Sequence, residues 1–225
     1  MPTHDTAVTQ VRAALTTVAD PRRASQMAAY VKHVAPFLGV TSPERRTATG
    51  GWIRDFDPEP LAAPLLATAA ALVDEPEREF AYVAIDLVRR HHRALPEDAL
   101  LPLRTLALQR PWWDTVDGWA QVIGRTALQH RAWDAVVLAW AHDEWLWARR
   151  IALVFQVGRR DAVDLDILFS ACRANLGQAD FFLRKGIGWG LRDAARTHPD
   201  AVRSFVAEHR TELSTLSVRE ATKHL

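Results

Sequence analysis

Apolar side chains recur along most of the chain at spacings of three and four residues, the pattern of amphipathic helices with one buried face. Alternation of apolar and polar residues, which would indicate half-buried strands, is rare. Proline and glycine interrupt the helical pattern at Pro21, Leu38-Gly39, Pro58, Pro60, Pro76, Pro96, Pro111, Gly158, Gly177 and Pro199. The pattern therefore predicts an all-α protein whose helices are of ordinary length and joined by short turns.

Four of the expected helical segments resemble one another. They are FAYVAID, WDTVDGW, ARRIALV and LRKGIGW, which start at residues 80, 113, 148 and 183. The starts are 33, 35 and 35 residues apart, and a period near 35 with two helices per unit is typical of an α-solenoid. The tetratricopeptide pattern is missing, so we expect HEAT-like repeats in a single domain of residues 1–225. Such a fold has a concave face that is lined by one helix per repeat.

One carboxylate breaks the apolar pattern of these segments. At the fifth position they carry Ala84, Asp117, Ala152 and Ile187, so only Asp117 is charged. A helix would place Trp113, four residues earlier, on the same face as Asp117. A carboxylate beside an indole ring suits a cationic ligand. The alternative is a core tryptophan next to an aspartate that caps a helix or pairs with a neighbouring arginine.

The stretch KGIGWGL places Gly186, Gly188 and Gly190 inside an expected helix. Each glycine costs about 1 kcal/mol relative to alanine in such a position. Two interpretations are open. Either the glycines allow close packing against a neighbouring helix, or they leave Trp189 accessible to a large ligand.

The stretch LGVTSPERR reads as a turn into a helix, with Ser42 as the expected N-cap and Pro43 as the first helical residue. A helix N-terminus followed by Arg45 and Arg46 would suit a phosphate, although a plain capping motif explains the same residues.

Arginine dominates the basic residues, since only three of the 28 are lysine. The planar fork of arginine suits phosphate and carboxylate groups, and biased codon usage is the alternative explanation of the excess as a whole, so clusters are more informative than the total. Arg149 and Arg150 are adjacent on an expected helix and point to different sides, so one of them is expected to face the concave surface. Lys185, at the third position of its segment, is a candidate phosphate contact.

Composition limits the remaining classes. A chain of 225 residues with 48 % hydrophobic content can build one sizeable core, and a net charge of +1 decides nothing about nucleic acid. The single cysteine, Cys172, excludes an internal disulfide, and the apolar run Leu61–Val73 is too short to span a bilayer. No signal peptide, metal-ligand spacing, Walker loop, GxSxG or dinucleotide motif stands out. We expect a cytoplasmic protein with no membrane contact, no metal and no cofactor.

Six stretches occur in order from about residue 27 to the last residue. They are MAAYVKHVAPFLGVTSPERR, EPEREFAYVAIDLV, WWDTVDGW, LWARRIALVFQ, FFLRKGIGWGLRDAARTHPD and LSVREATKHL. In these stretches the chain resembles the AlkD-type DNA alkylation-repair glycosylases, which are built from HEAT-like repeats. WWDxVD together with IGWxLR is a specific pair of motifs.

The resemblance implies roles residue by residue. Trp113 and Asp117 match the catalytic pair, and Trp189 matches the aromatic residue that contacts the lesion nucleotide. Tyr30, Arg150 and Arg192 match residues that line the DNA-binding face. With the phosphate candidates above, the expected DNA-binding residues are Tyr30, Ser42, Arg45, Arg46, Arg150, Lys185 and Arg192.

The function implied by the resemblance is monofunctional base excision. The protein would act as a monomer on double-stranded DNA, releasing purines alkylated at N3 or N7, such as 3-methyladenine and 7-methylguanine, and leaving an abasic site. It would be associated with the nucleoid when bound to DNA. The alternatives are a HEAT-like protein that binds distorted or branched DNA without excision, and a protein-binding scaffold. A carboxylate in an apolar repeat position favours the glycosylase, because a scaffold has no use for it.

Overall fold

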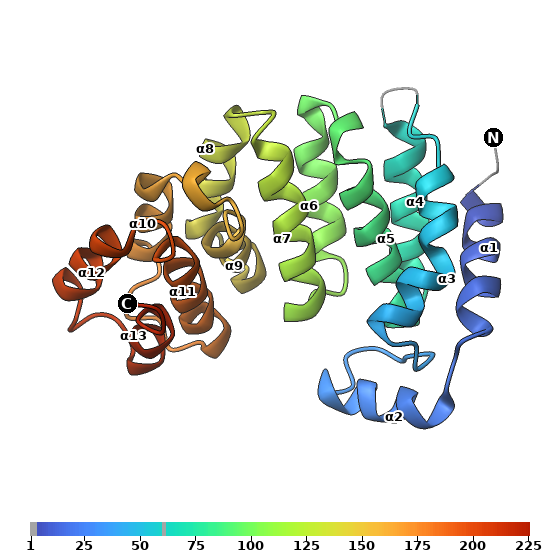
Figure 1. Cartoon of the computed structure of the whole chain (residues 1–225), viewed down its shortest axis with the longest axis horizontal. Helices are drawn as coiled ribbons and strands as arrows, with labels where there is room; N and C mark the ends of the chain where they lie inside the picture. The colour runs from blue at the N-terminus through green and yellow to red at the C-terminus, as the bar shows by residue number, and fades with distance from the viewer. Residues whose placement is uncertain (1–3, 60–61) are drawn as a thin grey trace. The chain divides into compact units, whose positions relative to one another are not determined.

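The computed structural model describes residues 4–59 and 62–225, and these residues form thirteen α-helices, four short 3-10 helices and no strand (Figure 1). The α-helices are α1 (His4–Thr16), α2 (Pro21–Tyr30), α3 (Ser42–Asp55), α4 (Ala63–Asp74), α5 (Arg78–Arg90), α6 (Leu100–Leu108), α7 (Trp113–Ala127), α8 (Ala132–Ala139), α9 (Leu146–Val154), α10 (Leu165–Arg173), α11 (Phe181–Ala194), α12 (Pro199–Glu208) and α13 (Thr215–Ala221). The 3-10 helices are η1 (His92–Ala94), η2 (Glu97–Ala99), η3 (Trp140–His142) and η4 (Arg160–Ala162). The prediction of an all-α protein is confirmed.

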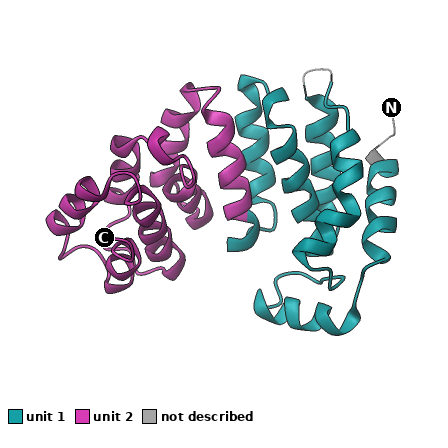
Figure 2. Cartoon of the chain, viewed as in Figure 1, with its two compact units in different colours: residues 1–115 teal, residues 116–225 magenta. Residues whose placement is uncertain are grey.

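The chain divides into two compact units, residues 1–115 and 116–225 (Figure 2). The boundary falls inside α7, so the first three residues of this helix belong to the first unit and the remainder to the second. The prediction of a single domain over residues 1–225 stays a prediction.

Within each unit, helices that are two apart in the sequence pack side by side. In the first unit α3 contacts α5 and α4 contacts α6, while α4 also packs on α5. In the second unit α9 contacts α11, α11 contacts α13, and α8 contacts α10. In the contacts between helices two apart, odd-numbered helices pack on odd-numbered ones and even-numbered helices on even-numbered ones, which gives the two layers of an α-solenoid. The core between them buries large apolar side chains, among them Phe80, Leu87, Leu103, Trp119, Trp133 and Ile151.

The four similar segments lie in α5, α7, α9 and α11, so the sequence period follows the odd-numbered layer. At the fifth position Ala84, Ala152 and Ile187 are buried, as expected for the apolar face of a repeat. Asp117 occupies the same position, and its side chain is 14 % exposed. The carboxylate is thus placed where the other three segments contribute to the core.

The start of α3 differs from the expectation by one residue. Thr41 is the N-cap and Ser42 is already helical, because the Glu44 side chain closes a capping box by accepting from the Thr41 backbone N–H at 2.9 Å and the Thr41 hydroxyl at 2.7 Å. The bonds from Thr41, together with a hydrogen bond from the Arg23 guanidinium, lower the pKa of Glu44 to about 2. The prediction of Ser42 as N-cap was wrong because the glutamate three residues after the threonine selects the cap.

The turn that leads into α3 is held by a buried carboxylate of α5. Glu79 accepts the backbone N–H groups of Leu38, Gly39 and Val40 at 2.9–3.0 Å. Gly39 has φ of +85°, and a Cβ there would lie 2.0 Å from the Asp20 carbonyl oxygen. Only glycine fits this crossing, which explains why the helical pattern breaks at Gly39.

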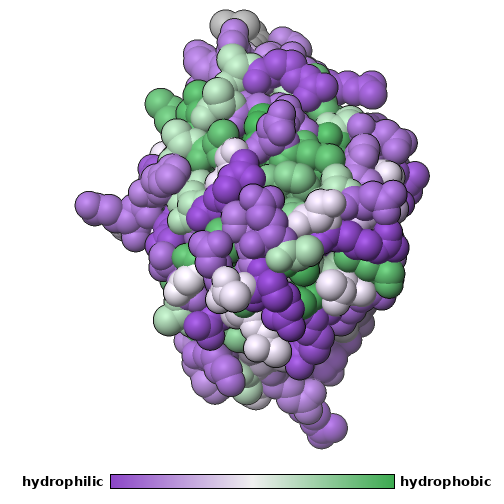
Figure 3. Space-filling model, turned by 90° about the vertical axis from the view of Figure 1, so that its left-hand side faces the viewer, coloured by the Kyte–Doolittle hydropathy of each residue, from purple (hydrophilic) through white to green (hydrophobic). Residues whose placement is uncertain are grey.

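The face drawn in Figure 3 is largely hydrophilic, with smaller hydrophobic areas between the polar side chains. In residues 4–59 and 62–225, no helix has the length and apolar character needed to cross a membrane.

Candidate functional site

Each aspartate of the WWDTVDGW motif is held by its own arginine. Asp114, in the first turn of α7, accepts from Arg78 of α5 at 2.9 Å (Nε to Oδ2) and 2.7 Å (Nη2 to Oδ1). Arg78 also donates to the Thr115 hydroxyl at 3.0 Å, and the Tyr82 hydroxyl donates to Asp114. Burial, followed by the charge of Asp114, raises the pKa of Tyr82 above its usual value. This network fixes the N-terminus of α7 on α5.

The second aspartate is paired within the second unit. Arg150 of α9 donates from Nε to Oδ1 and from Nη2 to Oδ2 of Asp117, both at 2.7 Å, and from Nη1 to the Phe182 carbonyl oxygen at 2.6 Å. The Arg150 side chain is only 6 % exposed. Such a two-point contact with a planar guanidinium fixes both the position and the plane of the carboxylate. Of the alternatives for Asp117, pairing with a neighbouring arginine is confirmed.

Trp113 is the first residue of α7 and is half-buried, so it is not a core tryptophan. The exposed ring of Tyr30, at the end of α2, packs edge-on against it with 5.8 Å between ring centroids. Trp113 and Asp117 stand four residues apart on α7, as the sequence predicts, and an α-helix brings residues at this spacing to one side.

The glycines around Trp189 allow close packing of α11. A Cβ at Gly188 would lie 2.5 Å from the Cβ of Glu220, and a Cβ at Gly190 would lie 2.6 Å from the Leu153 carbonyl oxygen. The close-packing interpretation of KGIGWGL is therefore confirmed. Trp189 itself is half-buried.

The buried carboxylate of Glu220, in α13, forms ion pairs with three basic side chains. Lys185 Nζ donates to it at 3.0 Å, Arg192 Nη1 at 2.6 Å, and Lys223 Nζ at 3.0 and 3.2 Å. Burial alone would raise the pKa of Glu220, but the hydrogen bonds from Lys185 and Lys223 lower it to about 2. Lys185 and Arg192 lie four residues before and three residues after Trp189 on α11, so one carboxylate anchors the cations on both sides of this tryptophan.

The other predicted DNA-binding residues lie on α3 and differ in exposure. Arg45 is buried: its Nη2 donates to Asp86 at 3.0 Å, and its guanidinium lies over the Tyr82 ring, 5.0 Å from the centroid. Ser42 and Arg46 are exposed. Phosphate binding by all three residues stays a prediction. The Arg45 guanidinium is already engaged by Asp86 and Tyr82.

Sequence reasoning did not single out the residues that hold the candidate groups in place. Arg78, Asp86 and Glu220 pair with residues 36, 41 and 35 positions away, about one repeat, but a repeat period alone does not specify which side chains form ion pairs. Two of the matched stretches, EPEREFAYVAIDLV and LSVREATKHL, contain these three residues. The repeat period and the resemblance to a family were the signals that could have drawn attention to them.

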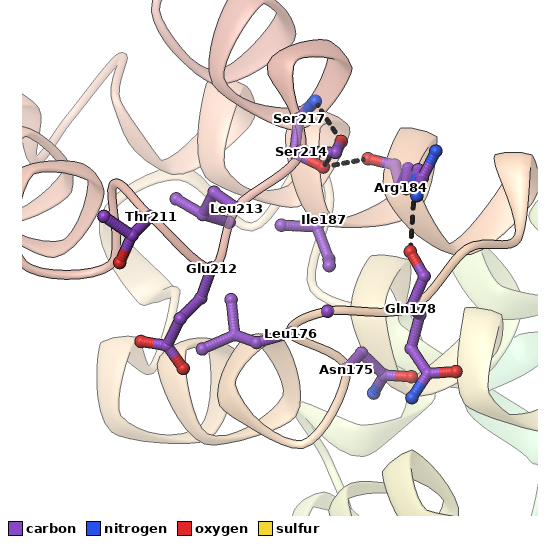
Figure 4. A pocket seen from close by; sticks show the side chains of 11 residues that line it. Asn175, Leu176, Gln178, Arg184, Ile187, Thr211, Glu212, Leu213, Ser214 and Ser217 are labelled. Carbon is purple, nitrogen blue, oxygen red and sulfur yellow. Dashed lines mark hydrogen bonds between the residues drawn. The ribbon is translucent and has the colours of Figure 1, made fainter.

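A pocket of about 250 Å³ lies in the second unit, near the start of α11 and the segment before α13 (Figure 4). Its walls include Arg184, Ile187, Glu212, Leu213 and Ser217, and none of the predicted site residues. The Ser217 hydroxyl donates to the Arg184 carbonyl oxygen at 2.9 Å, and Arg184 donates to the Gln178 carbonyl oxygen at 2.7 Å. The Ser217 hydroxyl and the Nε of Arg184 are thus engaged within the protein.

Among the described residues, no group of three or more histidine, cysteine, aspartate or glutamate side chains is arranged to hold a metal ion. The candidate groups are instead carboxylates paired with cations, and tryptophans that are half-buried.

A family model described as DNA alkylation repair enzyme matches residues 11–225. The chain belongs to the DNA alkylation repair enzyme family. This family match covers all the candidate site residues in both units.

A solved structure has a similar fold, with a TM-score of 0.84 and 30 % sequence identity over 92 % of this chain and 96 % of the other. It is described as a predicted DNA alkylation repair enzyme from Enterococcus faecalis. No curated protein matches the chain.

Proposed function

We propose that the protein is a monofunctional DNA glycosylase. It hydrolyses the N-glycosidic bond of cationic purines alkylated at N3 or N7, such as 3-methyladenine and 7-methylguanine, in double-stranded DNA and leaves an abasic site. The observation that carries the proposal is Asp117, a carboxylate held by Arg150 at a repeat position that is otherwise apolar. Membership of a DNA alkylation repair family supports it.

The reaction does not need a strong general acid, because the alkylated base is already cationic. When the bond between the sugar C1′ and the purine nitrogen breaks, its electron pair goes to the cationic base, which leaves as a neutral molecule. The sugar becomes oxocarbenium-like, the oxygen of a water molecule bonds to C1′, and that water loses a proton. The group that helps most is therefore a fixed negative charge near C1′ that can also orient the water.

Asp117 supplies this charge in the proposal. Because Arg150 binds both of its oxygens, the carboxylate keeps one orientation and does not have to reorganise as positive charge develops on the sugar. Arg150 is then a positioning residue for Asp117, in addition to its predicted place on the DNA-binding face.

The aromatic residues bind the cationic nucleotide. The face of an indole ring attracts a cation, and both Trp113 and Trp189 are half-buried, so each keeps part of its surface available. Tyr30 supports Trp113 by the edge-on contact between their rings. We assign the contact with the lesion nucleotide to both tryptophans.

Phosphates of the DNA backbone are bound by the cations and by the start of α3. Ser42 and Arg46 are exposed, and Lys185 and Arg192 keep 37 % and 24 % of their side-chain surface exposed while paired with Glu220. Such contacts fix the register of the duplex without reading its sequence. Arg45 of α3 is buried and stabilises the start of this helix by binding Asp86 and packing on Tyr82 of α5.

The proposal is monofunctional because a lyase step would need a neutral amine as nucleophile. Lys185 is the lysine nearest to the motif around Trp189, and it is ion-paired with Glu220. Strand cleavage that appears without added base or abasic endonuclease would contradict this part of the proposal.

The test is release of 7-methylguanine from duplex DNA by the wild type, by Asp117→Asn and by a matched control, Asp134→Asn. Asp134 is also a buried aspartate, paired with Arg159 at 2.8 Å in the same unit. We expect release by the wild type and by Asp134→Asn, and a loss of about two or more orders of magnitude in Asp117→Asn. Similar losses in both variants would mean that breaking any buried pair abolishes activity.

Lack of release by the wild type, with duplex binding intact, would overturn the glycosylase proposal for this lesion. It would favour the alternative of a DNA-binding protein without excision activity. Lack of duplex binding as well would favour a protein scaffold, since both DNA-binding functions require affinity that falls steeply with salt.

A further inference from the structure

The turn that follows α2 holds two consecutive non-glycine residues in the left-handed region. Lys32 has φ of 61° and His33 has φ of 59°. Their backbone N–H groups donate to the carbonyl oxygens of Ala29 at 3.0 Å and Ala28 at 2.7 Å, which closes the end of the helix. Glycine is the usual residue in such a helix end, because a Cβ is disfavoured there. Lys32 and His33 therefore occupy two positions whose backbone conformation favours glycine.

The protein itself makes no visible use of these side chains. Both are exposed, and within the described part of the chain neither has a side-chain hydrogen bond or an ion pair. Strain of this kind persists most often where function requires the side chain. An external ligand would give such a requirement, and the ammonium group of Lys32 makes an anion the natural choice.

The position of the turn identifies which anion. Tyr30 lies two residues before Lys32, and its ring packs on Trp113 at 5.8 Å between centroids. The turn therefore stands beside the start of α7 within the first unit. A cation next to a tryptophan that binds a nucleotide is well placed for a phosphate that flanks this nucleotide.

We propose that the 32–33 turn is a phosphate-binding element of the DNA site, in which Lys32 contacts the backbone phosphate beside the nucleotide that packs on Trp113. The inference rests on the proposed function and adds a residue to it. Lys32 and His33 are consecutive and both exposed, so His33 provides a second donor next to the ammonium group.

The test uses a substitution that should improve the fold and weaken the function. Lys32→Gly relieves the backbone strain, so its Tm should rise by about 2–4 °C. It also removes one phosphate contact, so affinity for an undamaged duplex at about 0.1 M salt should fall roughly 3- to 10-fold. The slope of log K against log salt should become shallower by about 1.

Two further variants separate charge from strain. Lys32→Ala removes the charge but keeps the left-handed side chain, so binding should weaken without a rise in Tm. Arg160→Gly is the matched control, because Arg160 is also exposed, positively charged and left-handed with φ of 53°, and lies between α9 and α10. It should gain stability like Lys32→Gly and keep the wild-type affinity for the duplex.

Each outcome bears on one proposal. Wild-type binding that Lys32→Gly and Lys32→Ala leave unchanged, or an equal loss of binding in Arg160→Gly, would overturn the phosphate role of Lys32 and leave the glycosylase proposal intact. The wild type could bind duplex in a way that depends on salt and on Lys32 but release no base. This result would support the phosphate role of Lys32 and overturn only the excision step. A wild type that binds no duplex would overturn both.

Discussion

The guanidinium of Arg150 binds both oxygens of Asp117 at 2.7 Å and uses its remaining nitrogen to bind the carbonyl oxygen of Phe182. One arginine of α9 thus fixes the charged residue of α7 and the first turn of α11. Its geometry gives Asp117 a single orientation and also stabilises the second unit. Substitutions can separate these two contributions.

Arg150→Lys keeps the positive charge but replaces the planar two-point contact by a single flexible one. We expect base release to fall by about 10- to 100-fold, because Asp117 loses its fixed orientation, while the free energy of unfolding changes less than in Arg150→Ala. Single-turnover rates and denaturant unfolding measure the two effects. Arg159→Lys is the control, because Arg159 is also buried and paired with Asp134. This substitution should lower stability without a comparable loss in the rate of base release. A fully active Arg150→Lys would contradict the positioning role.

The two aspartates of WWDTVDGW should behave differently. Asp114→Asn leaves Arg78 without its charged partner, and loss of one partner of a buried ion pair costs on the order of 3 kcal/mol. We expect a large fall in stability but, below the Tm of the variant, a smaller loss of base release than in Asp117→Asn. The reason is that Asp114 faces α5, where Arg78 and Tyr82 bind it. Equal losses of rate at matched folded fractions would count against Asp117 as the reacting carboxylate.

Gly188→Ala should destabilise the protein by about 1–3 kcal/mol, because the new Cβ would lie 2.5 Å from the Cβ of Glu220 and the two helices must move apart. Gly50→Ala is a matched control in α3, where a Cβ meets nothing within 4 Å. It should stabilise the protein by roughly 1 kcal/mol through helix propensity alone. Denaturant unfolding of both variants checks the prediction, and a Gly188→Ala protein as stable as the wild type would show that α11 and α13 are not closely packed.

Glu220 should contribute to acid sensitivity. Its pKa falls from 4.5 to about 2 in the folded protein, so its ion pairs stabilise the fold fully above about pH 4.5. This contribution is lost as the pH falls from about 4.5 towards 2, where the folded form also becomes protonated. Glu220→Gln should therefore be less stable than the wild type at neutral pH, and the difference should shrink over this range.

Urea unfolding at several pH values measures this effect. Glu44→Gln is a useful comparison, because the pKa of Glu44 is also lowered to about 2 but the residue is partly exposed and lies in the first unit. A stability difference between wild type and Glu220→Gln that does not change with pH would mean that the loss comes from packing and not from charge.

The sequence by itself determined the helices and their repeat. Apolar spacing and the proline and glycine breaks predict most helix ends, because these residues act on the local backbone. Three breaks were missed, those around Gln129, Asp143 and Arg210, where neither proline nor glycine is present. There local hydrogen bonds form the turns: the Gln129 N–H donates to the Thr126 carbonyl oxygen, the Asp143 side chain accepts from the Trp145 N–H, and the Glu212 N–H donates to the His209 carbonyl oxygen.

The sequence also determined that Asp117 is exceptional, since a carboxylate at an apolar repeat position can be recognised from the period alone. Only the tertiary structure decided which groups bind it. Arg150 lies 33 residues away and Arg78 lies 36 residues from Asp114, and no local rule links residues at such distances. The same holds for Glu220, which is 35 residues from Lys185. Helix formation depends on neighbours along the chain, whereas the placement of buried charges depends on which helices pack together, and only the folded core defines that.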